Sequence, residues 1–144
     1  MFTNILIAVD ASDLAAKAIE EGVTLARKTG ARITALTVAE PFHTFTMDPA
    51  VVEDTREEYK KHTQEQSSRT LSAVAAAAQQ AGVACETVVK ENEHPYQAII
   101  DTAKSRGCDL VVMASHRRRG LDGVIHGSET LKVLNHCDIP VLVG

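Results

Sequence analysis

The fold of this chain is decided at residues 5–13, which read ILIAVDASD. Five consecutive apolar residues are typical of a strand buried on both faces, because a strand with one wet face alternates apolar and polar residues. Ser12 is placed to cap a helix, and Asp13 falls in its first turn. From Leu14 to Thr29 the polar residues recur at helical spacing. The start of the chain therefore predicts a buried strand followed by an amphipathic helix.

The same alternation continues outward to the end of the chain. Further strands are predicted at residues 33–38, 85–89, 110–113 and 140–143, and further helices at 48–81, 95–106 and after 127–128. Gly30, Gly82 and Gly107 are expected to end three of the helices. The helix over 48–81 has a strongly polar first half that is expected to lie over solvent, and it is either continuous or broken once. The order βαβαβαβαβ predicts an α/β fold, a five-stranded parallel sheet with helices on both faces, in one domain over residues 1–144.

Composition narrows the classes of function. The 144 residues include 15 Lys and Arg against 19 Asp and Glu, for a net charge of −4. An acidic chain without a basic run argues against duplex DNA and against a basic membrane anchor, and 3% aromatic residues offer no stacking surface for single strands. No apolar run is long enough to span a membrane, and the start lacks the pattern of a signal peptide. Cys85, Cys108 and Cys137 form no paired motif, so we expect free thiols and a cytoplasmic protein without a membrane partner.

Candidate ligand sites follow from the predicted sheet. In parallel α/β sheets, ligands bind outside the carboxyl ends of the strands, where the strand order reverses. Three segments lie at such ends: residues 9–12, residues 38–40 and the long loop that begins at Ala114. That loop carries three arginines and leads into Gly127-Ser128 at a helix start, where backbone N–H groups and the helix dipole favour an anion. Composition leaves two interpretations open, a phosphate cradle or a solvated basic loop with an ordinary helix cap.

Other constellations are less favoured. His116, His126 and His136 recur every ten residues, which is a neighbour spacing in neither a helix nor a strand, so a three-histidine metal site is not expected. Asp10 and Asp13 resemble the acidic pocket of phosphorylation receivers, but an acceptor Asp after the third strand and a Lys after the fifth are missing. No phosphate-binding P-loop and no nucleophile elbow occurs.

Five segments, in order along the chain, match the pattern of a known family. They are ILIAVD at 5–10, LVVM at 110–113, SHRRRGL at 115–121, GSET at 127–130 and IPVLV at 139–143. On these segments the chain resembles the universal stress protein family over its whole length. The resemblance implies a five-stranded α/β fold of the adenine-nucleotide-binding, Rossmann-like type, usually dimeric.

The resemblance also implies a set of site residues. Nucleotide-binding members carry Gly-x2-Gly-x9-Gly-Ser/Thr after the fourth strand, and here that spacing falls on Ala114, Arg117, Gly127 and Ser128, so two of three glycines are replaced. Asp10 corresponds to the aspartate that meets adenine and ribose, and the residue that lines the base pocket corresponds to Val38. With three flanking residues, the expected nucleotide-binding set is Asp10, Val38, Met113, Ala114, His116, Arg117, Gly127, Ser128 and Glu129.

The function implied by the resemblance is a cytoplasmic universal stress protein that binds an adenine nucleotide, ATP or AMP, as a regulatory ligand in stress response. Mg²⁺ would accompany ATP. Little or no catalysis is expected, because no general base or metal carboxylate is evident beside the loop, although slow hydrolysis stays open. The alternative is a nucleotide-free dimeric interaction module. A homodimer is expected through the last strand, Val141, Leu142 and Val143, because a short apolar edge recruits another strand. We also expect an unidentified protein partner and no nucleic acid.

Overall fold

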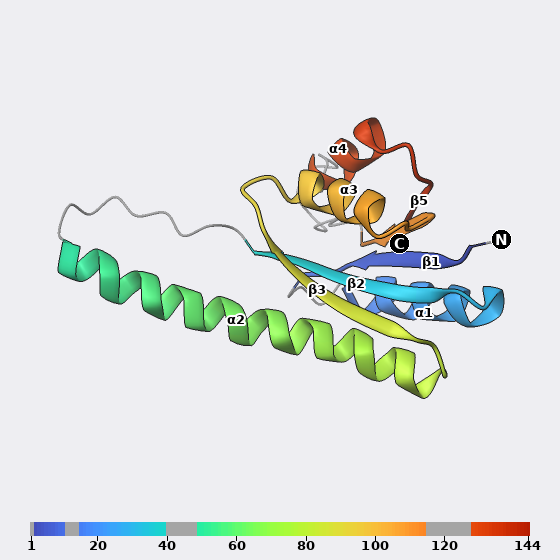
Figure 1. Ribbon diagram of the computed structural model, residues 1–144, viewed down its shortest axis with the longest axis horizontal. Helices are drawn as coiled ribbons and strands as arrows, with labels where there is room; N and C mark the ends of the chain where they lie inside the picture. The colour runs from blue at the N-terminus through green and yellow to red at the C-terminus, as the bar shows by residue number, and fades with distance from the viewer. Residues whose placement is uncertain (1, 11–14, 40–48, 115–127) are drawn as a thin grey trace, which may run out of the picture.

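The computed structural model describes residues 2–10, 15–39, 49–114 and 128–144, and only the backbone of residues 15, 49–55, 128 and 129. Strands and helices alternate along it in the predicted order (Figure 1). The elements are β1 Asn4–Ala8, α1 Ala15–Thr29, β2 Arg32–Ala39, α2 Pro49–Gln80, β3 Cys85–Glu91, α3 Pro95–Ser105, β4 Leu110–Met113, α4 Ser128–His136 and β5 Val141–Val143. The strands pair in parallel in the order β3-β2-β1-β4-β5. The predicted α/β fold with a five-stranded parallel sheet is confirmed.

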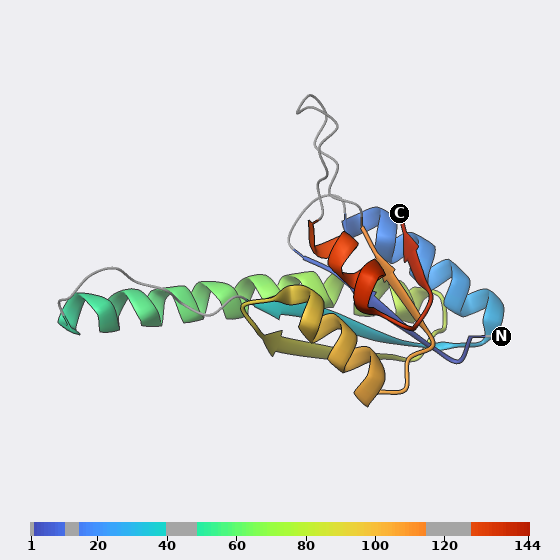
Figure 2. The same ribbon diagram turned by 90° about the horizontal axis from the view of Figure 1, so that it is seen from above.

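Helices cover both faces of the sheet, as Figures 1 and 2 show. Ile5 and Ile7 of β1 pack into a core with α1 and α2, whereas Leu6 packs into a second core with Ile99 of α3 and Val133 of α4. Successive side chains of a strand point to opposite faces, so a central strand between two helical layers must be apolar at every position. This is the physical reason for the uninterrupted apolar run at the start of the sequence.

Glycines set two features of the helices. Gly30, Gly82 and Gly107 have φ of 75°, 71° and 66°, the left-handed conformation that ends a helix, as predicted. Gly22 lies inside α1 for a different reason. A Cβ atom at this position would lie 2.5 Å from Cδ1 of the buried Ile7, so only glycine lets α1 approach β1 this closely.

The helix α2 is one continuous element of 32 residues, which settles the prediction that left a break open. At 1.5 Å per residue it is about 48 Å long, whereas the eight residues of β2 span about 26 Å. Every described side chain from Arg56 to Gln66 is exposed or half-exposed. Among the described side chains of α2, burial begins at Ser67 and continues with Leu71 and later residues. The polar first half therefore extends past the sheet into solvent, as predicted (Figure 1).

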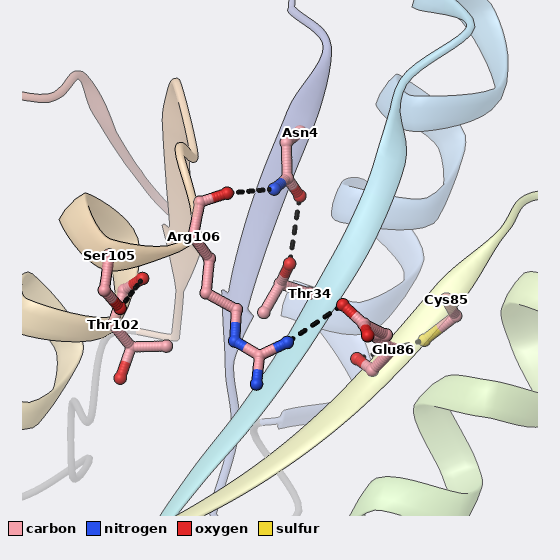
Figure 3. Close-up of polar contacts among 7 residues, drawn as sticks. All are labelled: Asn4, Thr34, Cys85, Glu86, Thr102, Ser105 and Arg106. Carbon is pink, nitrogen blue, oxygen red and sulfur yellow. Dashed lines mark hydrogen bonds and ion pairs between the residues drawn. The ribbon is translucent and has the colours of Figure 1, made fainter.

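A polar cluster ties three segments together at the amino end of the sheet (Figure 3). The side chain of Asn4 is almost fully buried, and its Nδ2 donates a hydrogen bond of 2.9 Å to the carbonyl of Arg106. Its Oδ1 accepts a hydrogen bond of 3.0 Å from the hydroxyl of Thr34, which is also buried. A single amide thus links β1, β2 and the end of α3.

The carboxylate of Asp109, just before β4, forms hydrogen bonds to the start of β1 at the same end of the sheet. It accepts hydrogen bonds from the backbone N–H groups of Thr3, at 2.9 Å, and Asn4, at 3.1 Å, and from the Thr3 hydroxyl. Burial alone would raise the pKa of Asp109, but these hydrogen bonds to the ionised form outweigh it, so the pKa lies below its ordinary value. The amino ends of β1 and β4 are therefore held together by a charged group that stays ionised at neutral pH.

The three cysteines are free thiols, as predicted. Burial, followed by the neighbouring charge of Glu86, raises the pKa of Cys85, and burial also raises the pKa of Cys108. Among the described helices, none is both long enough and apolar enough to cross a membrane.

Candidate functional site

The strand order reverses beside β1, the central strand of the sheet. The chain passes from β1 outward to β2 and β3, and then returns to the other side of β1 to form β4 and β5. The helices that follow these two strands, α1 and α4, pack on opposite faces of the sheet. In parallel α/β sheets, the crevice that binds ligands lies at the carboxyl ends of two such strands. The candidate site lies at this crevice.

Strand register places two of the predicted residues next to each other. Ala8 pairs with Leu36 of β2, and the N–H of Val9 still donates to the carbonyl of Leu36 at 2.9 Å. Carried on by two residues, the same register sets Asp10 level with Val38. The side chain of Asp10 is exposed, whereas Val38 is half-buried against the core on the α3 and α4 side. A carboxylate and an apolar side chain thus lie at the carboxyl ends of adjacent strands.

The end of β4 supplies two more predicted residues. Ala8 pairs with Met113, and both pack into the core on the α3 and α4 side. Ala114 is buried in the opposite core, with α1 and α2, so its methyl group points away from the face on which α4 begins. The replacement of the first family glycine by alanine therefore adds its methyl group to the core and leaves this face of the crevice unchanged.

The start of α4 borders the crevice and contains a residue that the sequence reasoning missed. Thr130 precedes Val133 by three residues, and Val133 is fully buried against the sheet, so helical spacing turns Thr130 toward the sheet as well. The hydroxyl of Thr130 is buried and has no hydrogen-bond partner in the described part of the chain. A buried hydroxyl without a partner is costly, which makes this oxygen a group that a ligand could satisfy. The signal in the sequence was a hydroxyl residue in the first turn after Gly127-Ser128.

Several predicted residues are not placed. His116, Arg117 and Gly127 lie outside the described residues, as does the proposed helix cap at Ser12. Ser128 and Glu129 begin α4, as predicted, but only their backbone is described. The structure therefore places Asp10, Val38 and Met113 at the carboxyl ends of β1, β2 and β4, and it turns the side chain of Ala114 into the opposite core. The phosphate loop stays a sequence-based prediction.

A second concave surface lies elsewhere. A groove of about 1010 Å³ runs between α2 and the edge strand β3, with Lys60, Ser67 and Ala75 on one wall and Thr87 and Val89 on the other. It opens on the α2 face at the outer edge of the sheet, whereas the crevice faces α4 at the centre of the sheet. The groove is therefore a separate feature from the candidate site.

Comparison with known proteins agrees with this architecture. The sequence profile described as the Universal stress protein family matches residues 1–143. The universal stress protein YxiE of Bacillus subtilis is 30% identical over 147 residues, which cover 99% of each chain. The solved structure of UspA from Lactobacillus plantarum is similar at 29% identity and a TM-score of 0.73, over 98% of this chain and 96% of that one.

A more distant similarity concerns the fold alone. A family protein from Arabidopsis thaliana, solved with AMP bound, has a TM-score of 0.64 at 22% identity, over 98% of this chain and 89% of that one. The sheet order, the crevice beside β1 and the match over almost the whole length lead to one conclusion: this chain belongs to the universal stress protein family.

Proposed function

We propose that this chain binds an adenine nucleotide, ATP or AMP, at the carboxyl ends of β1, β2 and β4, as a regulatory ligand in a cytoplasmic stress response with little or no catalysis. The observation that supports the proposal is the register of β1 and β2, which, continued two residues past Ala8 and Leu36, sets Asp10 level with Val38 at the point where the strand order reverses. A carboxylate can accept hydrogen bonds from ribose hydroxyls or the adenine amino group, and a half-buried valine can pack against the base.

The first turn of α4 supports the phosphate end of the proposal. Free backbone N–H groups and the helix dipole at the start of a helix favour a phosphate group. The unpartnered hydroxyl of Thr130 lies in the same turn and could donate to the ligand. Relatives of the same fold have been solved with AMP, with dAMP and with cAMP, which supports an adenine nucleotide as the ligand class.

The test is direct. Freshly purified protein is denatured, and the released small molecules are identified by mass spectrometry. We expect ATP or AMP in amounts approaching one per chain, and we expect added nucleotide to raise the melting temperature, because a ligand that binds only the folded state stabilises it. If no nucleotide is released and millimolar ATP and AMP leave the melting temperature unchanged, the chain is instead a nucleotide-free dimeric interaction module.

Arg117 tests the phosphate loop, since it replaces the second family glycine. If the loop keeps a left-handed backbone there, a side chain costs roughly 1–2 kcal/mol, and its bulk opposes close approach of phosphate. A solvent-exposed arginine contact to phosphate contributes less, about 0.2–1 kcal/mol. We therefore expect Arg117→Gly to tighten ATP binding several-fold in calorimetric titration. Arg118→Gly is the matched control and should not tighten binding. A tenfold weaker affinity of Arg117→Gly would make Arg117 a phosphate ligand.

We further propose a homodimer through β5. The strand pairs only with β4 among the described elements, and Leu142 is 38% exposed on it. The neighbouring helix α4 also exposes two leucines, Leu131 and Leu134. An apolar edge beside an apolar helix surface favours an isologous contact between two copies.

Leu142→Lys should therefore yield monomers at low micromolar concentration in analytical ultracentrifugation, because a charged side chain blocks an apolar edge contact. Lys132→Ala, on a helix position that does not belong to the apolar surface, is the control. A dimer that persists unchanged in Leu142→Lys would place the interface elsewhere.

A further inference from the structure

The edge of the sheet opposite β5 is formed by β3, which lies away from the candidate nucleotide site. Among the described elements β3 pairs only with β2, and its central residue on the α2 side, Val89, is 52% exposed. An edge strand presents a row of backbone N–H and C=O groups that can pair with another strand.

The hydrogen bonds to β2 show which residues present these groups. At one end of β3 the carbonyl of Ala84 accepts from the N–H of Ile33 at 2.8 Å, and at the other end the N–H of Asn92 donates to the carbonyl of Ala39 at 3.0 Å. Backbone groups alternate in direction along a strand, so the even-numbered residues of β3 bond to β2. The odd-numbered residues direct their N–H and C=O groups outward: Cys85, Thr87, Val89 and Glu91.

The sequence of this edge is complementary to itself. If a second β3 runs antiparallel about a two-fold axis at Val88, Thr87 lies opposite the partner's Val89, and Cys85 lies opposite the partner's Glu91. Each of these pairs joins two outward-directed residues, which is the arrangement that exchanges two backbone hydrogen bonds. The outward groups of the edge are then satisfied without a change in the ladder to β2.

Charge is complementary in the same register. Glu86 lies opposite the partner's Lys90, on the face that carries α3, and the two-fold axis repeats this pair. The side chain of Glu86 is 67% exposed, and its carboxylate lies 2.9 Å from a guanidinium nitrogen of Arg106. Figure 3 shows this ion pair. A carboxylate held in this way still has lone pairs for an ammonium group. Opposite charges directly across two strands stabilise the pairing, and like charges destabilise it.

The side chains of β3 on the α2 face of the sheet are also compatible with this antiparallel pairing. Thr87 and Val89 line the groove beside α2, and a second β3 would place the partner's Thr87 directly against Val89. Pairs of β-branched residues are favourable across strands. The exposed valine would then be covered by a side chain of matching shape.

We propose that β3 binds β3 of a second copy of this chain, antiparallel and centred on Val88, as an interface distinct from β5. The contact has few large apolar side chains, so it forms at higher protein concentration than the β5 dimer. With both edges in use, dimers associate further into tetramers and longer assemblies, because each chain then has two isologous surfaces.

A charge exchange tests the register. In the Leu142→Lys background, which removes the β5 contact, sedimentation should show a monomer that dimerises as concentration rises. Glu86→Lys and Lys90→Glu, made singly, should each weaken this dimer about tenfold or more. The double variant Glu86→Lys/Lys90→Glu should restore it, and so should an equimolar mixture of the two single variants, because opposite charges then face each other again. If Leu142→Lys sediments like the wild type, the same comparison is read in the wild-type background.

Amide hydrogen exchange gives a second readout that does not depend on charge. At high protein concentration the amides of Thr87, Val89 and Glu91 should become protected, whereas those of Glu86, Val88 and Lys90 should be protected at every concentration. Thermal unfolding of each variant shows whether the fold is retained. The proposal is overturned if the odd-numbered amides exchange equally fast at low and high concentration, or if the double variant and the mixture fail to restore the dimer.

Discussion

Asp10→Ala should weaken the binding of ATP and of AMP by the same factor. A hydrogen bond to a charged group contributes about 1.5–3 kcal/mol, which corresponds to roughly 10- to 150-fold in the dissociation constant. The factor is the same for both nucleotides because they share the adenosine that Asp10 is proposed to contact beside Val38. Calorimetric titration of the purified variant with each nucleotide measures both constants.

Two further variants sharpen this result. Asp101→Ala removes the same charge from an exposed position on α3 and should leave both affinities unchanged, which separates a local contact from the general effect of charge. Asp10→Asn keeps an acceptor oxygen and should lose less affinity than Asp10→Ala. A loss confined to ATP would contradict the assignment, because it would mean that Asp10 acts on the phosphates or on a metal ion bound to them.

Asn4→Ala should lower the free energy of unfolding by about 2–4 kcal/mol, the other large effect that we expect. The substitution removes the hydrogen bonds of Asn4 to the buried hydroxyl of Thr34 and to the carbonyl of Arg106. Loss of a partner by a buried polar group costs about 1–3 kcal/mol. Denaturation in urea measures the change. Nucleotide affinity should stay the same, since this cluster lies at the amino end of the sheet and the crevice at the carboxyl end.

A double-mutant cycle isolates the contact between the two side chains. Thr34→Val removes the hydroxyl that Asn4 accepts from, so in the double variant Asn4→Ala/Thr34→Val no hydroxyl is left unpaired. We expect the double variant to be less destabilised than the sum of the single variants by about 1 kcal/mol. Strict additivity would mean that the two side chains do not stabilise each other.

The layers of the fold could be predicted from the sequence, because a strand buried on both faces must be apolar at every position. Residues 5–9 form a continuous apolar run, which predicted a strand buried on both faces, and the structure shows that β1 is the central strand. The strand β3 was predicted two residues too short, because an edge strand has exposed positions, and Lys90 and Glu91 read as loop residues. The polar cluster of Asn4 was not predicted, since its members lie at positions 4, 34 and 106 and only the fold brings them together.

For the candidate site, the residues at strand ends could be predicted from the sequence, but the direction in which a side chain points could not. Asp10 follows an apolar run and Val38 is the last residue of the strand predicted at 33–38, so their place at the carboxyl ends of strands could be predicted from the sequence. Whether the methyl group of Ala114 enters the crevice or the core depends on which face that position takes, and only the structure shows that it joins the core. The role of Thr130 could not be predicted either, because a threonine in the first turn of a helix is common. That its hydroxyl has no partner among the described residues is a result of the packing.

Because α2 is longer than the sheet that it covers, we expect its two halves to differ in local stability. In proteins, most of the stability of a helix comes from tertiary packing, and the described side chains of α2 before Ser67 are exposed or half-exposed, whereas Leu71, Val74 and Ala78 are buried in the core. The half before Ser67 therefore opens by local fluctuation at a free energy well below that of global unfolding, while the half from Leu71 to Ala78 opens only with the core. Proteolytic nicks, insertions or sequence drift in the outer turns would leave the sheet and its crevice intact. The helix thus offers a segment whose length and charge can change without cost to the fold.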